Sequence, residues 1–304
     1  MRTHPDNLKA IPRFPRLPVL FFAMVFTLAC DVSAEDRYGP DRQLNSAENR
    51  AQSQLSDTHA DSENAPPAPV VAELFTSEGC SSCPPADRIL RELHTDQPFA
   101  NAHIIVLSEH VDYWNRLGWV DPFSHARFSE RQRQYAYELR SDSVYTPQMI
   151  VNGHYEAVGS NRGDVLRTIQ RAVQNRPLFP VRLSLQGITS DADNSQIQAA
   201  RVRVEFEMPP GSASPEALQL VLAAVAHNLS VQVPRGENAG RNLSHVGVVR
   251  TWHEFDDLTF SEGRYHQEHT VRYFSEAPHT MQIVAFIQNV ATLNIPGAGT
   301  IDLN

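Results

Sequence analysis

The chain has 304 residues, of which 41% are hydrophobic and 20% are charged, so most of it is expected to fold around one or two hydrophobic cores. Its formal net charge of −9 argues against nucleic acid as a partner, because phosphate binding requires clustered lysine and arginine. Beyond the N-terminus, no apolar run reaches the roughly eighteen residues that a membrane-spanning helix needs.

The N-terminus has the pattern of an export signal, in which basic residues precede a short apolar run, LPVLFFAMVFTLA, at residues 17–29. The run leads into FTLAC, which resembles a bacterial lipobox. This resemblance implies cleavage before Cys30, lipidation of its sulfur and a membrane anchor, and Asp31 then favours the inner membrane. The alternative is an ordinary signal peptide cleaved after Ala34. Both interpretations predict an extracytoplasmic protein, either periplasmic and anchored or secreted.

Residues 31–68 follow this signal (residues 1–30) and contain few large apolar side chains among many polar and acidic ones. Such a composition buries too little surface to offset the entropy of ordering the chain. We therefore expect a disordered linker that ends where the folded part begins, near residue 69.

An α/β domain is predicted at residues 69–177. Apolar strands are expected at 70–75, 102–111, 144–153 and 154–160, with amphipathic helices at 84–94, 121–142 and 160–175. From residue 178 to residue 304 the pattern changes to short segments rich in β-branched residues, several of which alternate with a period of two. This second pattern predicts an all-β, sandwich-like domain.

Two of the three cysteines, Cys80 and Cys83, stand directly before the first helix in SEGCSSCPPAD. The order of strand, Cys-x-x-Cys, helix, strand, helix, strand, strand and helix resembles the thioredoxin fold. In that fold the helix start stabilises the attacking thiolate, here Cys80, and Cys83 resolves the mixed disulfide. Thr146 and Pro147 match the position of its cis-proline, so a cis bond is predicted there.

Four stretches carry a resemblance to one family, namely VAELFTSEGCSSCPPAD (71–87), SEHVDYWNRLGWVDPFS (108–124), YTPQMIVNG (145–153) and GENAGRNLSHVGVVR (236–250). Together they closely resemble a secreted bacterial family known as domain of unknown function 1223, over about residues 70–290. The resemblance implies a thioredoxin-like domain and no particular substrate.

Two alternatives to redox chemistry stay open. Cys80 and Cys83 could form an inert disulfide in a binding module, although a bridge that closes so small a loop gains little entropy. They could also bind copper together with a histidine, either His110 or His154, because thiolates suit Cu(I).

The end of the strand at 102–111, the segment after it and the start of the strand at 144–153 supply further candidates. Glu109 or Asp112 is a possible proton acceptor for Cys83, and Trp114 and Tyr145 are expected to line a substrate groove. The alternative is a solvated loop with aromatic anchors.

The loop at 236–245 could bring Arg241 and His245 to the cysteines if the two halves pack face to face, and otherwise it is a structural loop held by asparagine hydrogen bonds. No phosphate-binding or hydrolase motif is present in the sequence. The predicted activity is thus thiol–disulfide exchange with protein thiols and disulfides, without a cofactor.

Overall fold

The structure is a computed structural model, and it describes residues 66–175, 178–194, 196–211, 217–275 and 280–303. The first half contains, in chain order, β1 (Ala68–Thr76), α2 (Pro84–Asp96), β2 (Ala102–His110), the 3-10 helix η1 (Asn115–Leu117), α3 (Ala126–Glu138), β3 (Gln148–Val151), β4 (Tyr155–Val158) and α4 (Arg162–Asn175). The expected helix at 121–142 is shorter than predicted, because His125 caps α3 at its N-terminus by accepting a hydrogen bond from the Arg127 amide.

The second half is built of strands alone within the described residues: β5 (Phe179–Pro180), β6 (Arg182–Ser190), β7 (Ile197–Glu207), β8 (Leu218–Ala226), β9 (Leu229–Gln232), β10 (Asn242–His245), β11 (Val248–Phe255), β12 (Phe260–Ser261), β13 (Arg264–Phe274), β14 (Met281–Asn289) and β15 (Gly297–Asp302).

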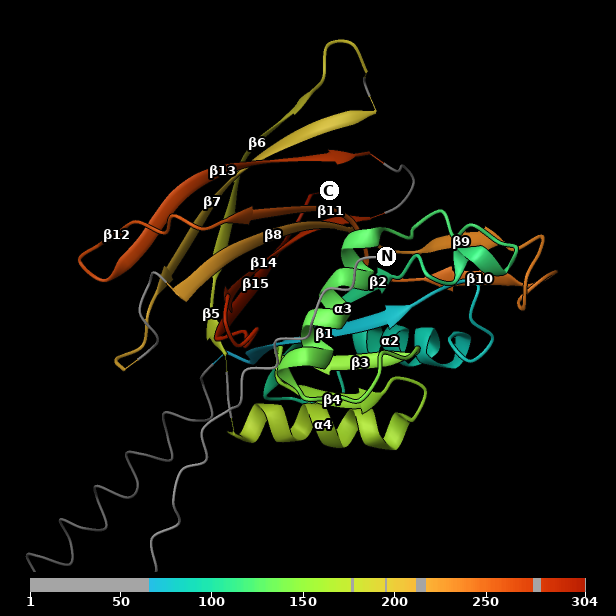
Figure 1. The fold of residues 1–304 in the computed structure, drawn as a ribbon. Coiled ribbons are helices and arrows are strands. Elements are labelled where there is room, and N and C mark those ends of the chain that lie inside the picture. Colours follow the sequence, from blue (N-terminus) through green and yellow to red (C-terminus); the bar gives the residue numbers. More distant parts are fainter. Residues whose placement is uncertain (1–65, 176–177, 195, 212–216, 276–279, 304) are drawn as a thin grey trace, which may run out of the picture. The chain divides into compact units, whose positions relative to one another are not determined.

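One large mixed sheet organises the fold, with the strand order β4-β3-β1-β2-β11-β8-β14-β15-β5 (Figure 1). β1 and β2 are parallel, while β3 is antiparallel to β1 and β4 is antiparallel to β3. Helices cover both faces of this part of the sheet. Side chains of α2 and α4 pack with Ala72 and Leu74, and side chains of α3 pack with Val71 and Phe75. Neighbouring residues of a strand point to opposite faces, and both faces are covered here, so β1 is buried almost throughout.

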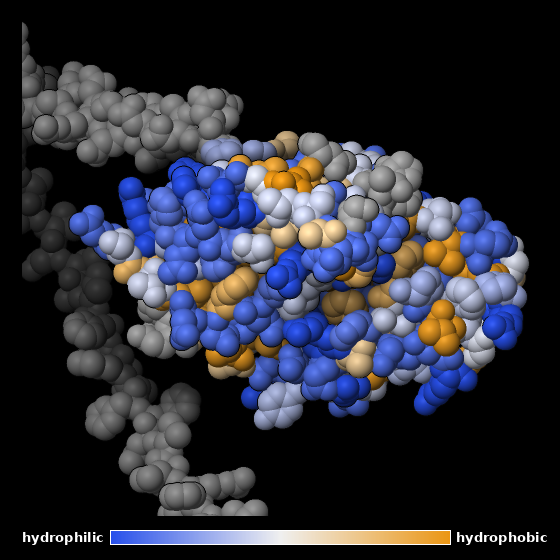
Figure 2. Space-filling view, turned by 90° about the horizontal axis from the view of Figure 1, so that it is seen from above, coloured by the Kyte–Doolittle hydropathy of each residue, from blue (hydrophilic) through white to orange (hydrophobic). Residues whose placement is uncertain are grey.

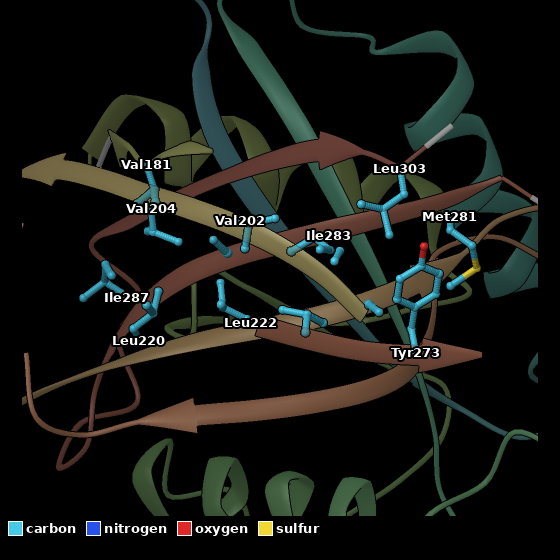
Figure 3. Packing of buried hydrophobic residues seen from close by; sticks show 14 of the residues in the cluster. Val181, Val202, Val204, Leu220, Leu222, Tyr273, Met281, Ile283, Ile287 and Leu303 are labelled. Carbon is cyan, nitrogen blue, oxygen red and sulfur yellow. The ribbon is translucent and has the colours of Figure 1, made fainter. Parts of the chain in front are cut away.

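A second sheet, β12-β13-β7-β6, packs on the other end of the large one. Figure 3 shows the core between them, where Val202 and Val204 of β7 meet Leu220 and Leu222 of β8 and Ile283 of β14. The two central strands of this second sheet, β7 and β13, alternate between buried and more exposed residues, as their sequence pattern predicts.

The expected separate sandwich is therefore wrong in one respect. β8, β11, β14 and β15 do not form a sheet of their own but extend the sheet of the first half. The physical reason is that β8 is buried on both faces: Leu222 faces the second sheet, and Val221 faces the core beneath α3. The structure is thus a mixed α/β fold with a large central sheet. The boundary placed at residue 177 stays a prediction.

The two halves of the large sheet meet at a parallel contact between β2 and β11. The Ser108 amide donates a hydrogen bond to the Gly247 carbonyl at 2.7 Å, and the Gly247 amide donates to His227 Nδ1 at 3.1 Å. Gly247 has a φ of 64°, and a Cβ there would lie 2.5 Å from the Val106 carbonyl oxygen. Only glycine fits so close an approach of two backbones.

Hydrophilic side chains predominate on the face seen in Figure 2, and the hydrophobic ones lie in small, separate groups. Of the helices in the described part of the chain, none has the length and apolar character needed to cross a membrane. The signal and lipidation predictions, including Cys30, lie outside the described residues.

Candidate functional site

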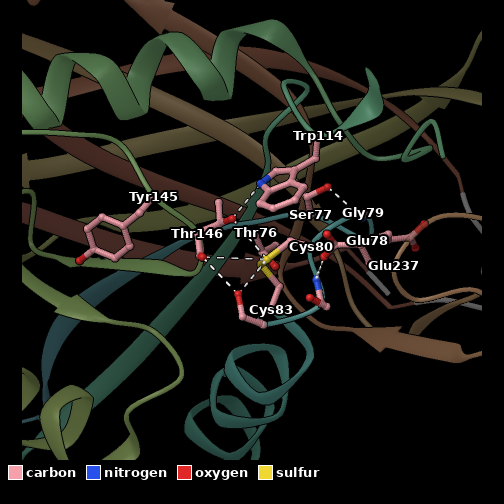
Figure 4. The surroundings of a disulfide bond; sticks show 12 residues. Thr76, Ser77, Glu78, Gly79, Cys80, Cys83, Trp114, Tyr145, Thr146 and Glu237 are labelled. Carbon is pink, nitrogen blue, oxygen red and sulfur yellow. Dashed lines mark hydrogen bonds between the residues drawn. A yellow bond between two sulfur atoms is a disulfide. The ribbon is translucent and has the colours of Figure 1, made fainter. Parts of the chain in front are cut away.

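A disulfide joins Cys80 and Cys83 at the start of α2 (Figure 4). Cys83 is the N-cap of this helix, and its carbonyl accepts hydrogen bonds from the Ala86 and Asp87 amides. The Cα atoms of the two cysteines are 5.4 Å apart, and both residues are fully buried, whereas Ser81 and Ser82 between them are exposed. The sulfurs thus lie beneath the surface, at the positive end of the helix dipole.

Hydroxyl groups surround the Cys80 sulfur. Thr146 Oγ1 lies 3.3 Å from Cys80 Sγ and Ser82 Oγ lies 3.2 Å from it. Trp114 Nε1 donates to Thr146 Oγ1 at 2.8 Å, which orients that hydroxyl towards the sulfur. The Thr146–Pro147 bond is cis, so this sequence prediction is confirmed.

The loop predicted at 236–245, whose last four residues form β10, reaches the cysteines from the second half of the chain, as the sequence suggested. The fully buried Asn238 side chain donates to the carbonyls of Glu78 and Cys80 at 2.8 and 2.9 Å, and it accepts from Arg241 at 2.7 Å. The Ser81 amide donates to the Glu237 carboxylate at 3.0 Å. These bonds fit the alternative interpretation of a loop held by asparagine hydrogen bonds, although the sequence did not single out Asn238, because its partners are backbone carbonyls.

Two buried imidazoles lie together here: His245 is the last residue of this stretch, and the centroid of the His110 ring is 4.9 Å from that of the His245 ring. His110 Nδ1 and Asp121 Oδ2 are 2.7 Å apart, and His245 Nε2 lies 3.3 Å from Glu78 Oε1. Burial opposes a charge on His110, but the carboxylates of Asp121, Asp87 and Glu78 together outweigh it, so the pKa of His110 is raised. Burial likewise opposes a charge on Asp121, whose pKa is nevertheless lowered by His110. The imidazolium–carboxylate pair is consequently favoured inside the protein.

Asp87 is a further buried carboxyl on α2, one turn after Cys83. It accepts a hydrogen bond from Thr76 Oγ1 at 3.0 Å, and its other oxygen lies 3.9 Å from His245 Nδ1. Burial raises the pKa of Asp87, against the opposing attraction of His245 and His110. Sequence reasoning missed Asp87, because an acid in the first turn of a helix is normally read as a partner of the helix dipole.

The two predicted proton acceptors do not join this site. Glu109 points to the face of the sheet that α3 covers, where Arg131 Nε lies 3.6 Å from its carboxylate. Burial and the nearby Glu73 raise the pKa of Glu109 well above its ordinary value. Asp112 accepts a hydrogen bond from Ser129 Oγ of α3.

Of the two predicted groove residues, Trp114 lies over the disulfide, whereas the Tyr145 ring points away from it (Figure 4). The histidines proposed as copper ligands have other surroundings. His110 is engaged with Asp121, and His154 follows β3 at the end opposite Pro147. Among the residues that the structure describes, no group of three or more His, Cys, Asp or Glu side chains is arranged to hold a metal ion.

Together these features define a mixed α/β protein with a buried disulfide at a helix start, completed by a loop from its second half. The chain belongs to the family described as "Protein of unknown function (DUF1223)", whose model matches residues 71–288. That match spans both halves of the central sheet, as the sequence resemblance implied.

Two solved structures resemble this one. A crystal structure of a protein from Agrobacterium tumefaciens is 26% identical, covers 77% of this chain and 94% of its own, and superposes with a TM-score of 0.53. HBP35 of Porphyromonas gingivalis is 17% identical, with 79% and 76% covered and a TM-score of 0.54, which is a likeness of fold alone. Comparison with curated proteins finds no match.

Proposed function

We propose that this protein is an extracytoplasmic thiol–disulfide oxidoreductase. The observation that carries the proposal is the Cys80–Cys83 disulfide at the start of α2, with the Thr146 hydroxyl 3.3 Å from Cys80 Sγ and a cis-proline next in the chain. In the reduced protein the same hydroxyl, with that of Ser82, would donate to a Cys80 thiolate. The attacking form of the sulfur is the thiolate, and hydrogen bonds to a charged acceptor are the stronger kind.

The reaction has two steps. The Cys80 thiolate attacks one sulfur of a substrate disulfide, the substrate S–S bond breaks, and the departing sulfur takes up a proton. The Cys83 thiolate then attacks Cys80 Sγ in the mixed disulfide, which releases the second substrate thiol and forms the Cys80–Cys83 bond. Two electrons pass to the substrate, and an external dithiol must return them to the protein.

We further propose that residues 69–177 form a thioredoxin-like unit. The parallel pair β1–β2, the antiparallel additions of β3 and β4, and helices on both faces support this assignment. Export and a lipid anchor at Cys30, with Asp31 directing the protein to the inner membrane, complete the proposal. Mass spectrometry of the mature N-terminus tests it, because lipidation requires an acylated Cys30 as the first residue.

One observation favours a second candidate, a binding module with an inert disulfide. Both sulfur-bearing residues are fully buried, with Trp114, Thr146 and Asn238 around them. A partner sulfur reaches Cys80 only if these groups move, whereas a structural bridge is best kept from solvent.

The reduction potential of the Cys80–Cys83 pair in glutathione buffers separates the two functions. A value above about −270 mV lies in the range of exchange catalysts, and a value below about −300 mV is typical of a structural bridge. Trapping is the second readout. Cys83→Ser leaves Cys80 without its resolving thiol and accumulates mixed disulfides with partners, whereas the matched Cys80→Ser control accumulates none. A low potential together with no trapped partner would disprove catalysis.

A further inference from the structure

A small hollow lies between α2 and β10 and reaches the first residue of α2. Its volume is about 170 Å³, and its lining includes Pro84, which directly follows Cys83. Three arginines surround it: Arg88 and Arg91 from α2, and Arg241 from the loop that leads into β10. We call it the arginine hollow.

The positive charges of the arginine hollow are not neutralised by neighbouring carboxylates. Arg91 donates to the Ser244 carbonyl and Arg241 donates to the Asn238 side-chain oxygen, and both acceptors are neutral. Arg88 is exposed and has neither a hydrogen bond nor an ion pair with any residue in the described part of the chain. In a protein with a net charge of −9, three unneutralised guanidinium groups around one hollow point to an anionic ligand.

One carboxyl does line the hollow, but it faces inwards. Asp87 is 6% exposed, and its oxygens are directed to Thr76 Oγ1 and to His245. Its charge is therefore associated with the buried imidazole and not with the arginines, which stay available to a ligand from solvent.

The position of the hollow relates it to the cysteines. Arg88 follows Cys83 by five residues, which is about 7.5 Å along a helix, and the Cα atom of Cys80 lies 5.4 Å from that of Cys83. An extended peptide advances about 3.3 Å per residue. A substrate whose cysteine is bonded to Cys80 would thus bring a side chain two to four residues away to the level of Arg88.

We propose that the arginine hollow binds an acidic side chain of the protein substrate, two to four residues from the cysteine that reacts with Cys80. This inference rests on the proposed exchange function and adds the sequence preference of the substrate. Guanidinium groups suit the role because they bind carboxylates in a bidentate manner, and they stay charged at any physiological pH.

The test uses the full chain and two short synthetic peptides that each contain one cysteine. One peptide carries aspartate three residues before and after its cysteine, and the other carries asparagine there. We expect the oxidised protein to react about tenfold faster with the acidic peptide at low ionic strength, which is the effect of a few partly exposed ion pairs. High salt should remove most of this preference.

Two variants test whether the preference for the acidic peptide arises from the arginine hollow. Arg88→Gln should lower it severalfold, and this exposed side chain has no hydrogen bond or ion pair within the described structure whose loss would unfold the protein. Arg167→Gln is the matched control, because Arg167 is 71% exposed on α4 and pairs only with Asp164 among the described residues. It should leave the preference unchanged. Equal rates for both peptides, or an equal effect of the two variants, would overturn the proposal while exchange itself stands.

Direct binding separates this proposal from the proposed function. A fluorescent, cysteine-free version of the acidic peptide should bind the protein by anisotropy, and Arg88→Gln should weaken it. Binding of this kind without any exchange would reject the enzyme but support the hollow. Tighter binding of inorganic phosphate, or Arg88-dependent binding to phosphatidylglycerol vesicles without peptide binding, would reject a peptide carboxylate as the ligand.

Discussion

Gly247 offers the sharpest test of how the two halves of the sheet are joined. Replacing it with alanine places a Cβ 2.5 Å from the Val106 carbonyl oxygen and 2.9 Å from Val106 Cγ2, in a residue whose φ is 64°. The left-handed backbone alone costs an alanine about 1–2 kcal/mol. Relieving the contact requires β2 and β11 to separate, and overpacking of this kind costs a further 1–3 kcal/mol or so.

Separation of the strands would also weaken the two hydrogen bonds at Gly247, which contribute about 0.5–1.5 kcal/mol each. The expected loss in the free energy of unfolding is therefore about 3–8 kcal/mol, measured by urea unfolding with tryptophan fluorescence. Gly240→Ala is the matched control: its φ is 80°, and a Cβ there meets nothing within 4 Å. It should lose only about 1–2 kcal/mol, the backbone cost alone. Equal losses in the two variants would refute the tight junction.

Two further predictions concern buried titratable groups. Burial and the stacked His94 lower the pKa of His227 to about 4, so the folded protein resists its protonation and loses about 3 kcal/mol of stability as the pH falls from 6.5 to about 4. Urea unfolding across that range should show this slope, and His227→Gln should flatten it. An unchanged slope in the variant would mean that groups other than His227 cause the loss of stability. Burial and Glu73 raise the pKa of Glu109 well above its ordinary value of 4.5. As the pH rises above 4.5, the unfolded chain loses this proton more readily than the folded protein, so the Glu109 carboxyl then lowers the free energy of unfolding. Glu109→Met should therefore raise the free energy of unfolding at neutral pH by about 1–3 kcal/mol, with little gain in acid and no change in the exchange rate. Slower exchange would restore Glu109 as the proton acceptor of Cys83.

Local signals in the sequence predicted the elements around the cysteines well. The strand expected at 102–111 is β2 (Ala102–His110), and the helix expected at 84–94 is α2 (Pro84–Asp96). Hydrophobic periodicity and the position of proline depend on near neighbours in the chain, so they can be read without knowing the fold.

The predicted proton acceptor Glu109 shows that local signals do not predict which face of the sheet a side chain occupies. Glu109 and His110 are adjacent, but successive residues of a strand point to opposite faces of the sheet. Glu109 meets Arg131 beneath α3, while His110 lies on the side of α2 with Asp121 and His245. The composition of the segment identifies it as polar and buried, but the face of each side chain depends on the register with β1, which the sequence does not state.

The sequence also did not predict which strands pair when they are far apart in the chain. A strand buried on both faces has the same composition whether it lies inside a separate sandwich or in the middle of a mixed sheet. β8 is such a strand, and its position next to β11 connects the sheet of the first half to the core of the second. The predicted sandwich failed at this point because composition specifies burial and not the neighbour.

The surroundings of the disulfide therefore depend on residues of the second half as well as on the cysteine motif. The carbonyls of Glu78 and Cys80 are paired by Asn238, which lies 158 residues after Cys80, and Glu78 itself lies 3.3 Å from His245. Buried carbonyls without partners cost free energy, so residues around the disulfide would not keep this arrangement without the loop at 236–245. The same loop contributes Arg241 to the arginine hollow. The second half therefore shapes the surroundings of the disulfide and, on our proposal, the choice of substrate as well.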